Sequence, residues 1–164
     1  MAESKTLDNL MKAFAGESQA NRKYVAYAKK AEKEGKLNAA KLFRVAADAE
    51  AIHASRQLEI AGKIGSTADN LKDGIEGETY EYKDMYPEFV KAAEAEGHRA
   101  ALTAFTHAMK AEEVHARLYK EALENLDQTE EVFYYLCPVC GNIEKSVPER
   151  CPICGVPGDR FIKY

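Results

Sequence analysis

The sequence repeats a short phrase in which a glutamate and a histidine stand three residues apart. The two copies read Ala-Glu-Ala-Ile-His-Ala and Ala-Glu-Glu-Val-His-Ala. On a helix, this spacing puts Glu50 with His53, and Glu112 with His115, on one face and one turn apart. Carboxylate and imidazole together suit iron or manganese better than metals that prefer thiolate. Both phrases are therefore candidate metal sites.

A matched glutamate precedes each phrase, in Gly16-Glu17-Ser18 and Gly77-Glu78-Thr79. Glu17 lies 33 residues before Glu50, and Glu78 lies 34 before Glu112. We interpret this as an internal duplication. One Glu on one helix and Glu-x-x-His on the next, present twice, is the ligand set of ferritin-like di-iron bundles. The pattern predicts an all-α four-helix bundle that holds two metal ions.

Glu81 is a further candidate ligand, which has no counterpart in the first repeat. It follows Glu78 by one helical turn on the same face. It is either a solvated surface glutamate or a ligand that competes with His53 for one iron as the oxidation state changes. Ferric iron, a hard ion, favours carboxylate, whereas ferrous iron accepts imidazole more readily. Glu50 and Glu112 are placed to bridge the two metals.

Two tyrosines fall near the predicted ligand faces. Tyr24 lies two turns after Glu17, and Tyr86 lies five residues after Glu81. Buried tyrosines usually only pack and form hydrogen bonds, and a purely structural role is one interpretation of both residues. Alternatively, their hydroxyls donate hydrogen bonds to bound peroxide or to a ligand carboxylate, which makes both candidate catalytic residues together with Glu81 and His53.

The four cysteines form a second candidate metal site near the end of the chain. Each Cys-x-x-Cys pair is followed by glycine, and the cysteines are Cys137, Cys140, Cys151 and Cys154. Four thiolates in tetrahedral geometry hold zinc or iron, and the spacing does not choose between them. A zinc ribbon that only folds the tail is the alternative to an iron electron carrier.

Apolar periodicity and glycines predict four helices, over residues 7–34, 37–64, 78–96 and 99–125. Pro87 lies inside the third and removes one backbone hydrogen bond, so we expect a kink or bulge there. We expect two domains: a ferritin-like bundle over residues 1–131 and a small four-cysteine domain over residues 132–164, which would need its metal to fold.

The connector at residues 66–77 determines how the helix pairs assemble. If extended, it could span roughly 40 Å at ~3.3 Å per residue, just enough to return along the bundle. Residues 69–73 resemble a capped helix start, however, and a helix rises only ~1.5 Å per residue. A helical connector would carry the last two helices into a bundle with a second copy, so both an unswapped bundle and a domain-swapped dimer stay open.

Composition narrows the class of protein. The chain has 164 residues, 46% of them hydrophobic and 30% charged, with a net charge of −4. The absence of a strongly basic stretch argues against nucleic-acid binding. We find neither an apolar run of membrane-spanning length nor the apolar core of a signal peptide, so we expect a cytoplasmic protein.

The chain resembles rubrerythrins over essentially its whole length. The resemblance rests on both Glu-x-x-His phrases and on two longer stretches, Gly-Glu-Ser-Gln-Ala-Asn-Arg from position 16 and Gly-Glu-Thr-Tyr-Glu-Tyr-Lys-Asp-Met-Tyr-Pro-Glu-Phe from position 77. The tail resembles a rubredoxin with a shortened gap between its cysteine pairs. This implies a di-iron peroxidase that reduces hydrogen peroxide to water and protects against oxidative stress.

The resemblance also implies roles for particular residues. Six would hold the diferric state, with Glu81 giving way to His53 on reduction: Glu17, Glu50, Glu78, Glu81, Glu112 and His115. Electrons would come from NAD(P)H through a separate reductase, directly or through free rubredoxin, and would pass through an iron in the four-cysteine tail. Zinc is the other metal that this tail could hold. Within one chain the two metal sites are expected to lie far apart, so a head-to-tail dimer would bring one tail near the other subunit's di-iron site.

Two other functions are compatible with the same residues. A ferroxidase would oxidise ferrous iron and store it, and would have no need of a tetrathiolate electron carrier. A structural protein with zinc in both sites would be colourless and redox-silent.

Overall fold

The computed structural model describes residues 4–164, which form two compact units divided between Gly65 and Ser66. The first unit is a helical hairpin. The second contains the remaining helices and the cysteine tail. The predicted class, mostly helical with a small C-terminal metal-binding domain, is confirmed.

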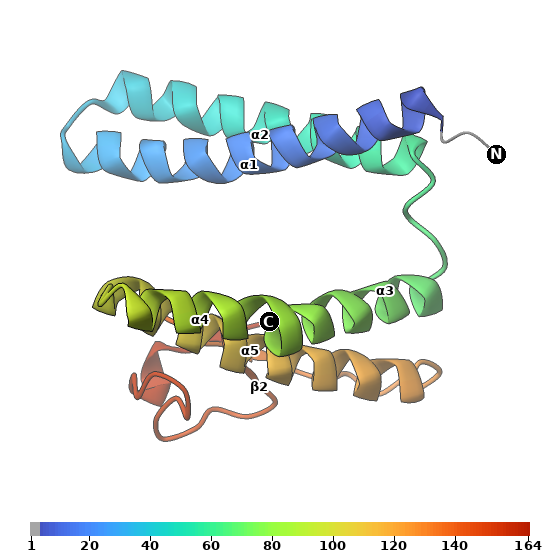
Figure 1. Ribbon diagram of the computed structural model, residues 1–164, viewed down its shortest axis with the longest axis vertical. Helices are drawn as coiled ribbons and strands as arrows, with labels where there is room; N and C mark the ends of the chain where they lie inside the picture. Colours follow the sequence, from blue (N-terminus) through green and yellow to red (C-terminus); the bar gives the residue numbers. More distant parts are fainter. Residues whose placement is uncertain (1–3) are drawn as a thin grey trace. The chain divides into compact units, whose positions relative to one another are not determined.

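The first unit consists of two long helices that lie side by side and antiparallel, α1 (Lys5–Lys33) and α2 (Leu37–Ile60) (Figure 1). The turn between them depends on Gly35, whose φ of 71° is accessible to glycine at little cost. The N–H of Gly35 donates to Glu32 O, and the N–H of Lys36 donates to Ala31 O. These bonds satisfy the last carbonyls of α1 and end it as predicted.

Small residues allow the two helices to approach closely. The buried positions of the hairpin are mostly alanines: Ala28, Ala31, Ala40, Ala47 and Ala54. Buried Asn21 joins the helices, because its Nδ2 donates to Ala47 O at 2.7 Å. In contrast, Leu42, Val45 and Ile52 of α2 are exposed. A two-helix hairpin buries little apolar surface, so its stability depends on further packing.

The second unit begins with a long interrupted helix that packs along α5 (Arg99–Glu124) (Figure 1). It comprises α3 (Thr67–Tyr80), a π-helical turn η1 (Glu81–Met85) and α4 (Tyr86–Ala95). The prediction that this helix begins at residue 78 is wrong by eleven residues. Ser66 caps it: its Oγ accepts a hydrogen bond from the Asp69 N–H, as the helix-start pattern in the connector suggested.

The π-helical turn explains why the two repeats differ in length by one residue. Sixteen residues separate Glu17 from the end of α1 at Lys33, whereas seventeen separate Glu78 from the end of α4 at Ala95. A π turn holds one more residue than an α turn. It ends at Met85, two residues before Pro87, so the bulge predicted in this helix is confirmed.

The tail forms a three-stranded antiparallel sheet in the order β2-β1-β3. The strands are β1 (Tyr135–Leu136), β2 (Ile143–Glu144) and β3 (Ile162–Lys163). Gly158 lies against the backbone, where an added Cβ would come within 1.7 Å of Pro148 O. Such short strands cannot support a hydrophobic core, so a metal must contribute to the tail's stability.

Among residues 4–164, none of the helices combines the length and apolar character that crossing a membrane requires.

Candidate metal centres

The first unit carries one half of the predicted carboxylate and histidine set. Glu17 comes from α1, while Glu50 and His53 come from α2, and their ligand atoms lie within 4.8 Å of one another. His53 Nδ1 lies 3.4 Å from Glu50 Oε2 and 4.0 Å from Glu17 Oε1. The histidine side chain is 57% exposed.

The two carboxyls of this half-site lie close to each other. Their mutual hydrogen bond raises the pKa of Glu17 above its usual value and lowers the pKa of Glu50. Two carboxylates in contact repel each other unless a proton or a cation lies between them. The group is therefore suited to hold a cation.

The second unit carries the matching half. Glu78 comes from α3, and Glu112 and His115 come from α5. His115 Nδ1 lies 2.6 Å from Glu112 Oε2 and 3.8 Å from Glu78 Oε1. Burial, followed by the charge of Glu112, raises the pKa of Glu78 to about 7. A buried carboxyl of this kind becomes ionised on binding a metal.

Two further predicted residues lie near this second half-site. Burial, and then the charge of Glu112, raises the pKa of Glu81. Burial and the same carboxylates also raise the pKa of Tyr86, whose ring packs at 6.0 Å from that of Phe89. The Tyr86 hydroxyl therefore stays protonated beside the ligands and can donate a hydrogen bond.

Tyr24 differs from Tyr86 in its surroundings. Its ring centroid lies 6.2 Å from those of both Tyr27 and Phe43, within an aromatic cluster of the first unit. These contacts fit the packing interpretation of Tyr24, and its catalytic role stays a prediction.

His115 connects the second half-site to the cysteine tail. Its Nε2 lies 2.9 Å from the carbonyl oxygen of Gly141, the residue directly after Cys140. Because a carbonyl only accepts, Nε2–H donates to Gly141 O, so Nδ1 is the ring nitrogen that faces the carboxylates and that can bind a metal once its own proton has left. Burial lowers the pKa of His115, but the bonds to Glu112 and Gly141 outweigh it and the net shift is upward.

This bond corrects one expectation. The two kinds of site were expected to lie far apart within one chain, but the tail binds the same unit that carries Glu78, Glu112 and His115. The sequence does not reveal the Gly141 carbonyl as a partner, because a backbone acceptor has no side-chain signature. Only its place in the Cys-x-x-Cys-Gly motif could have drawn attention to it.

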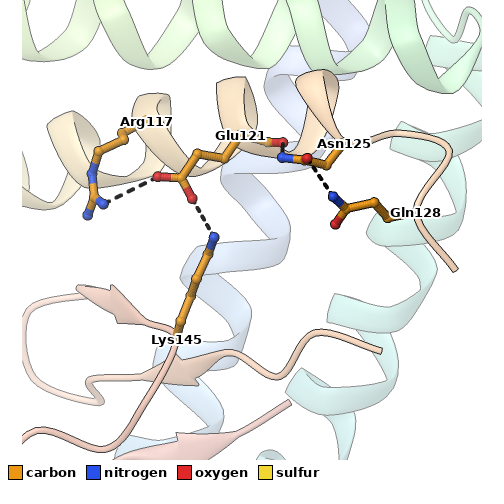
Figure 2. A network of polar contacts seen from close by, with 5 residues as sticks. All are labelled: Arg117, Glu121, Asn125, Gln128 and Lys145. Atoms are coloured by element: carbon orange, nitrogen blue, oxygen red, sulfur yellow. Dashed lines mark hydrogen bonds and ion pairs between the residues drawn. The ribbon is translucent and has the colours of Figure 1, made fainter. Parts of the chain in front are cut away.

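An ion pair also attaches the tail to α5. Lys145 contacts Glu121, which is bonded to Arg117 as well (Figure 2). The bond to Lys145 lowers the pKa of Glu121. At the end of α5 the network continues through Asn125, whose side chain accepts from Gln128 (Figure 2).

A cavity of about 550 Å³ lies between the tail and helices α3 and α5. Its walls are mostly apolar, with two of the candidate metal ligands as polar groups. The lining residues are Leu71, Glu78, His115, Leu118, Tyr119, Ala122, Tyr134, Leu136, Ile143 and Tyr164. Glu78 and His115 thus contact a largely apolar space, in which charge interactions are stronger than in water.

The four cysteine sulfurs converge in the tail as free thiols within 4.8 Å of one another. Cys137 Sγ lies 3.6 Å from Cys154 Sγ, and Cys140 Sγ lies 3.5 Å from Cys151 Sγ. A tetrahedral site with metal–sulfur bonds of ~2.3 Å has sulfurs ~3.8 Å apart, so the geometry fits a tetrathiolate metal.

The thiols themselves also favour a metal. Burial raises the pKa of Cys140. Burial also acts on Cys151, but backbone N–H donors from Cys154 and Ile153 outweigh it and lower its pKa to about 7. All four sulfurs become thiolates together only when a cation is bound.

Comparisons with known proteins cover both parts of the chain. A family model described as rubrerythrin matches residues 8–123, and one described as the rubredoxin-like domain of rubrerythrin matches residues 135–162. Nigerythrin of Nitratidesulfovibrio vulgaris is 38% identical over 178 residues, which cover 99% of this chain and 88% of that protein. Rubrerythrin of Porphyromonas gingivalis is 38% identical over 179 residues, covering 96% and 89%.

Solved structures of nigerythrin are also similar. A mixed-valence state has a TM-score of 0.59 and 39% identity, covering 100% of this chain and 91% of that one. A fully reduced, all-ferrous state has a TM-score of 0.60 and 38% identity, with the same coverage. The similarity extends across the helices and the tail together.

Proposed function

The chain belongs to the rubrerythrin family, and from this premise we propose that it reduces hydrogen peroxide to water at a di-iron centre supplied with electrons by an iron in its cysteine tail. The observation that carries the proposal is the bond from His115 Nε2 to Gly141 O, which connects a carboxylate and histidine half-site to a cysteine knuckle. Solved nigerythrin exists in mixed-valence and all-ferrous states, which supports iron as the metal.

Seven residues would hold the two irons: Glu17, Glu50, His53, Glu78, Glu81, Glu112 and His115. When bound, a pair of ferrous ions supplies two electrons together, so that one peroxide and two protons give two waters. Glu81 and His53 would exchange as ligands with oxidation state. The Tyr86 hydroxyl would donate a hydrogen bond to a ligand carboxylate or to the bound peroxide.

The tail would pass electrons one at a time through Cys140, the Gly141 carbonyl and the His115 ring. This path consists of covalent bonds and one hydrogen bond of 2.9 Å. The external donor would be a rubredoxin, an NAD(P)H-dependent reductase, or both in sequence.

The helix bounds support a domain-swapped dimer. In the di-iron arrangement, a two-fold axis relates the two helix pairs, so the chain must travel from the C-terminal end of α2 to the opposite end of the bundle. Glu50 lies ten residues before the end of α2 at Ile60, and Glu78 lies eleven residues after the start of α3 at Thr67. If both glutamates lie at the level of the metals, the end of α2 and the start of α3 are ~31 Å apart along the bundle axis, at ~1.5 Å per residue.

The connector is too short for that path. Seven steps from Ile60 to Thr67 reach at most ~25 Å when fully extended, before any sideways distance between helices is counted. With α2 and α3 at these bounds, the connector length argues against one chain joining its own two half-sites. A second copy would complete each site, with the first unit of one chain packed on the second unit of the other.

A visible spectrum of aerobically purified protein tests the function. We expect a red protein that bleaches with dithionite and regains ferric absorption rapidly when one equivalent of hydrogen peroxide is added. A colourless protein with zinc in the tail, or a reduced protein that peroxide does not reoxidise, would contradict the proposal. A cage-sized oligomer that takes up ferrous iron with oxygen would favour the ferroxidase instead.

A further inference from the structure

Asn142 is a buried polar residue between the two cysteine pairs. Its accessible surface is 0%. Its Nδ2 donates to Glu144 Oε1 at 2.8 Å and lies 4.0 Å from Cys151 Sγ. Its backbone carbonyl oxygen accepts a hydrogen bond from the Cys137 N–H at 2.8 Å. Asn142 therefore contacts the first cysteine pair through its backbone and the second through its side chain.

The chemistry of the neighbours determines how the amide is oriented. Both neighbours of Nδ2, a carboxylate and a thiolate, can only accept hydrogen bonds. The flipped amide would turn Oδ1 toward two anions, so the nitrogen must face them. Within the part of the chain that the structure describes, Oδ1 then has no hydrogen-bond partner.

An unsatisfied buried oxygen is unfavourable for stability, and leucine would fill a similar volume without it. Such a local conflict is expected where a residue serves a functional site. The group that benefits here is the Cys151 sulfur, which faces the positive end of the amide dipole.

We propose that Asn142 sets the reduction potential of the tail iron by directing its side-chain N–H at the Cys151 thiolate. This rests on the proposed function only in assigning iron to the cysteine site. On reduction the tetrathiolate centre gains one negative charge, and an N–H dipole aimed at sulfur stabilises that state. Asn142 therefore raises the potential, and it acts as a positioning and tuning residue, not as a ligand.

The test is the midpoint potential of the tail iron in the iron-loaded full chain, followed through its ferric thiolate absorption. Asn142→Leu should lower the equilibrium constant for reduction about tenfold, which is ~59 mV for one electron. Glu144→Gln is the matched control: it keeps an acceptor for the amide and removes a negative charge, so its potential should not fall below that of the wild type.

The outcomes separate this role from a structural one. An unchanged potential in Asn142→Leu, with the iron spectrum intact, would overturn the proposal. If this variant takes up no iron, the smaller Asn142→Val replaces it, and loss of iron from both would show that Asn142 is needed for folding instead. A wild-type tail that holds no iron would contradict the proposed function. Iron with an unshifted potential in Asn142→Leu would contradict only the role of Asn142.

Discussion

At the scale of single residues, the two predicted histidine ligands differ in how firmly they are held. His115 is 17% exposed, and both of its ring nitrogens have partners. His53 is 57% exposed, and its nearest carboxylate oxygen is 3.4 Å away. A residue that must leave and rejoin a metal benefits from weak restraint, so this asymmetry fits His53, and not His115, as the ligand that exchanges.

In the proposed exchange, the partner of His53 is Glu81. We expect Glu81→Ala to keep the fold and the tail spectrum but to lower peroxidase turnover about tenfold, a typical cost of losing a residue that tunes a metal site. Glu88→Ala, an exposed glutamate on the same helical run, is the control and should have no effect. Steady-state turnover measures both, and wild-type turnover in Glu81→Ala would refute the assigned role.

Glu78 predicts a pH dependence of the metal-free protein. Its pKa is raised from 4.5 to about 7 in the folded chain, so the folded state binds its proton more tightly than the unfolded state does. This contribution to stability is complete below about pH 4.5 and is lost as the pH rises toward 7. Between pH 4.5 and 7, the melting temperature of the wild type should fall by several degrees more than that of Glu78→Gln. Melting temperatures that change with pH in parallel in the two proteins would contradict the raised pKa of Glu78.

The candidate ligands could be predicted from sequence because their types and spacing are visible in it. Glu17, Glu50 and His53 meet because a Gly35 turn folds one helix back on the other. Two contributions could not be predicted: the Gly141 carbonyl, which depends on where the tail binds, and the buried amide of Asn142, which looks like an ordinary loop residue.

At the scale of elements, the π-helical turn is the main difference between the repeats. The position matching Glu81 in the first repeat is Ala20, within the regular helix α1. One extra residue and the candidate ligand Glu81 thus occur together in η1. This suggests that the π turn aims Glu81 at the second half-site, as such turns often do at functional sites.

Deleting exposed Lys83 from this turn tests that suggestion. The second repeat then has the length of the first, so a regular α-helix can form with its later faces unchanged. We expect a folded protein with wild-type circular dichroism and tail spectrum but with turnover lowered as in Glu81→Ala. Deleting Lys29, which is also exposed but lies in the regular helix α1, is the control and should destabilise the fold, because it rotates every later position by ~100°. Full turnover after the Lys83 deletion would mean that the π turn has no such role.

The four helices were predicted from periodicity and glycine stops, but the start of α3 was not. This helix contains Gly74 and Gly77, which disfavour helix. Tertiary contact compensates: a Cβ at Gly74 would lie 3.2 Å from the Tyr119 ring, so the glycine allows α3 and α5 to approach closely. Sequence periodicity carries no information about that contact.

At the scale of the whole molecule, assembly determines whether the half-sites ever meet. The first unit supplies two glutamates and one histidine, the second adds Glu81 to a matching set, and neither set alone has enough ligands for two metals. The short connector favours completion of each site by a second chain. Sequence alone left this open because it did not fix where α3 begins.

Complementation between two inactive variants distinguishes the assemblies. One variant carries Glu17→Ala and Glu50→Ala in the first unit, and the other carries Glu78→Ala and Glu112→Ala in the second. If the units swap, a mixed dimer pairs both intact halves in one site and both damaged halves in the other. Random co-assembly makes half of the dimers mixed, so we expect about a quarter of wild-type turnover and of iron bound at the carboxylate site.

An unswapped protein gives a different result, because every site would then contain one damaged half whichever chains associate. Co-expression of the two variants, with separate tags to isolate the mixed dimer, measures this directly. Each variant alone should be inactive while keeping its red tail, which shows that the tail has folded and loaded iron. The swap would be excluded if an isolated mixed dimer had no more activity, and no more iron at the carboxylate site, than the single variants. The first turns of α3 would then have to unwind so that the connector could reach across the bundle.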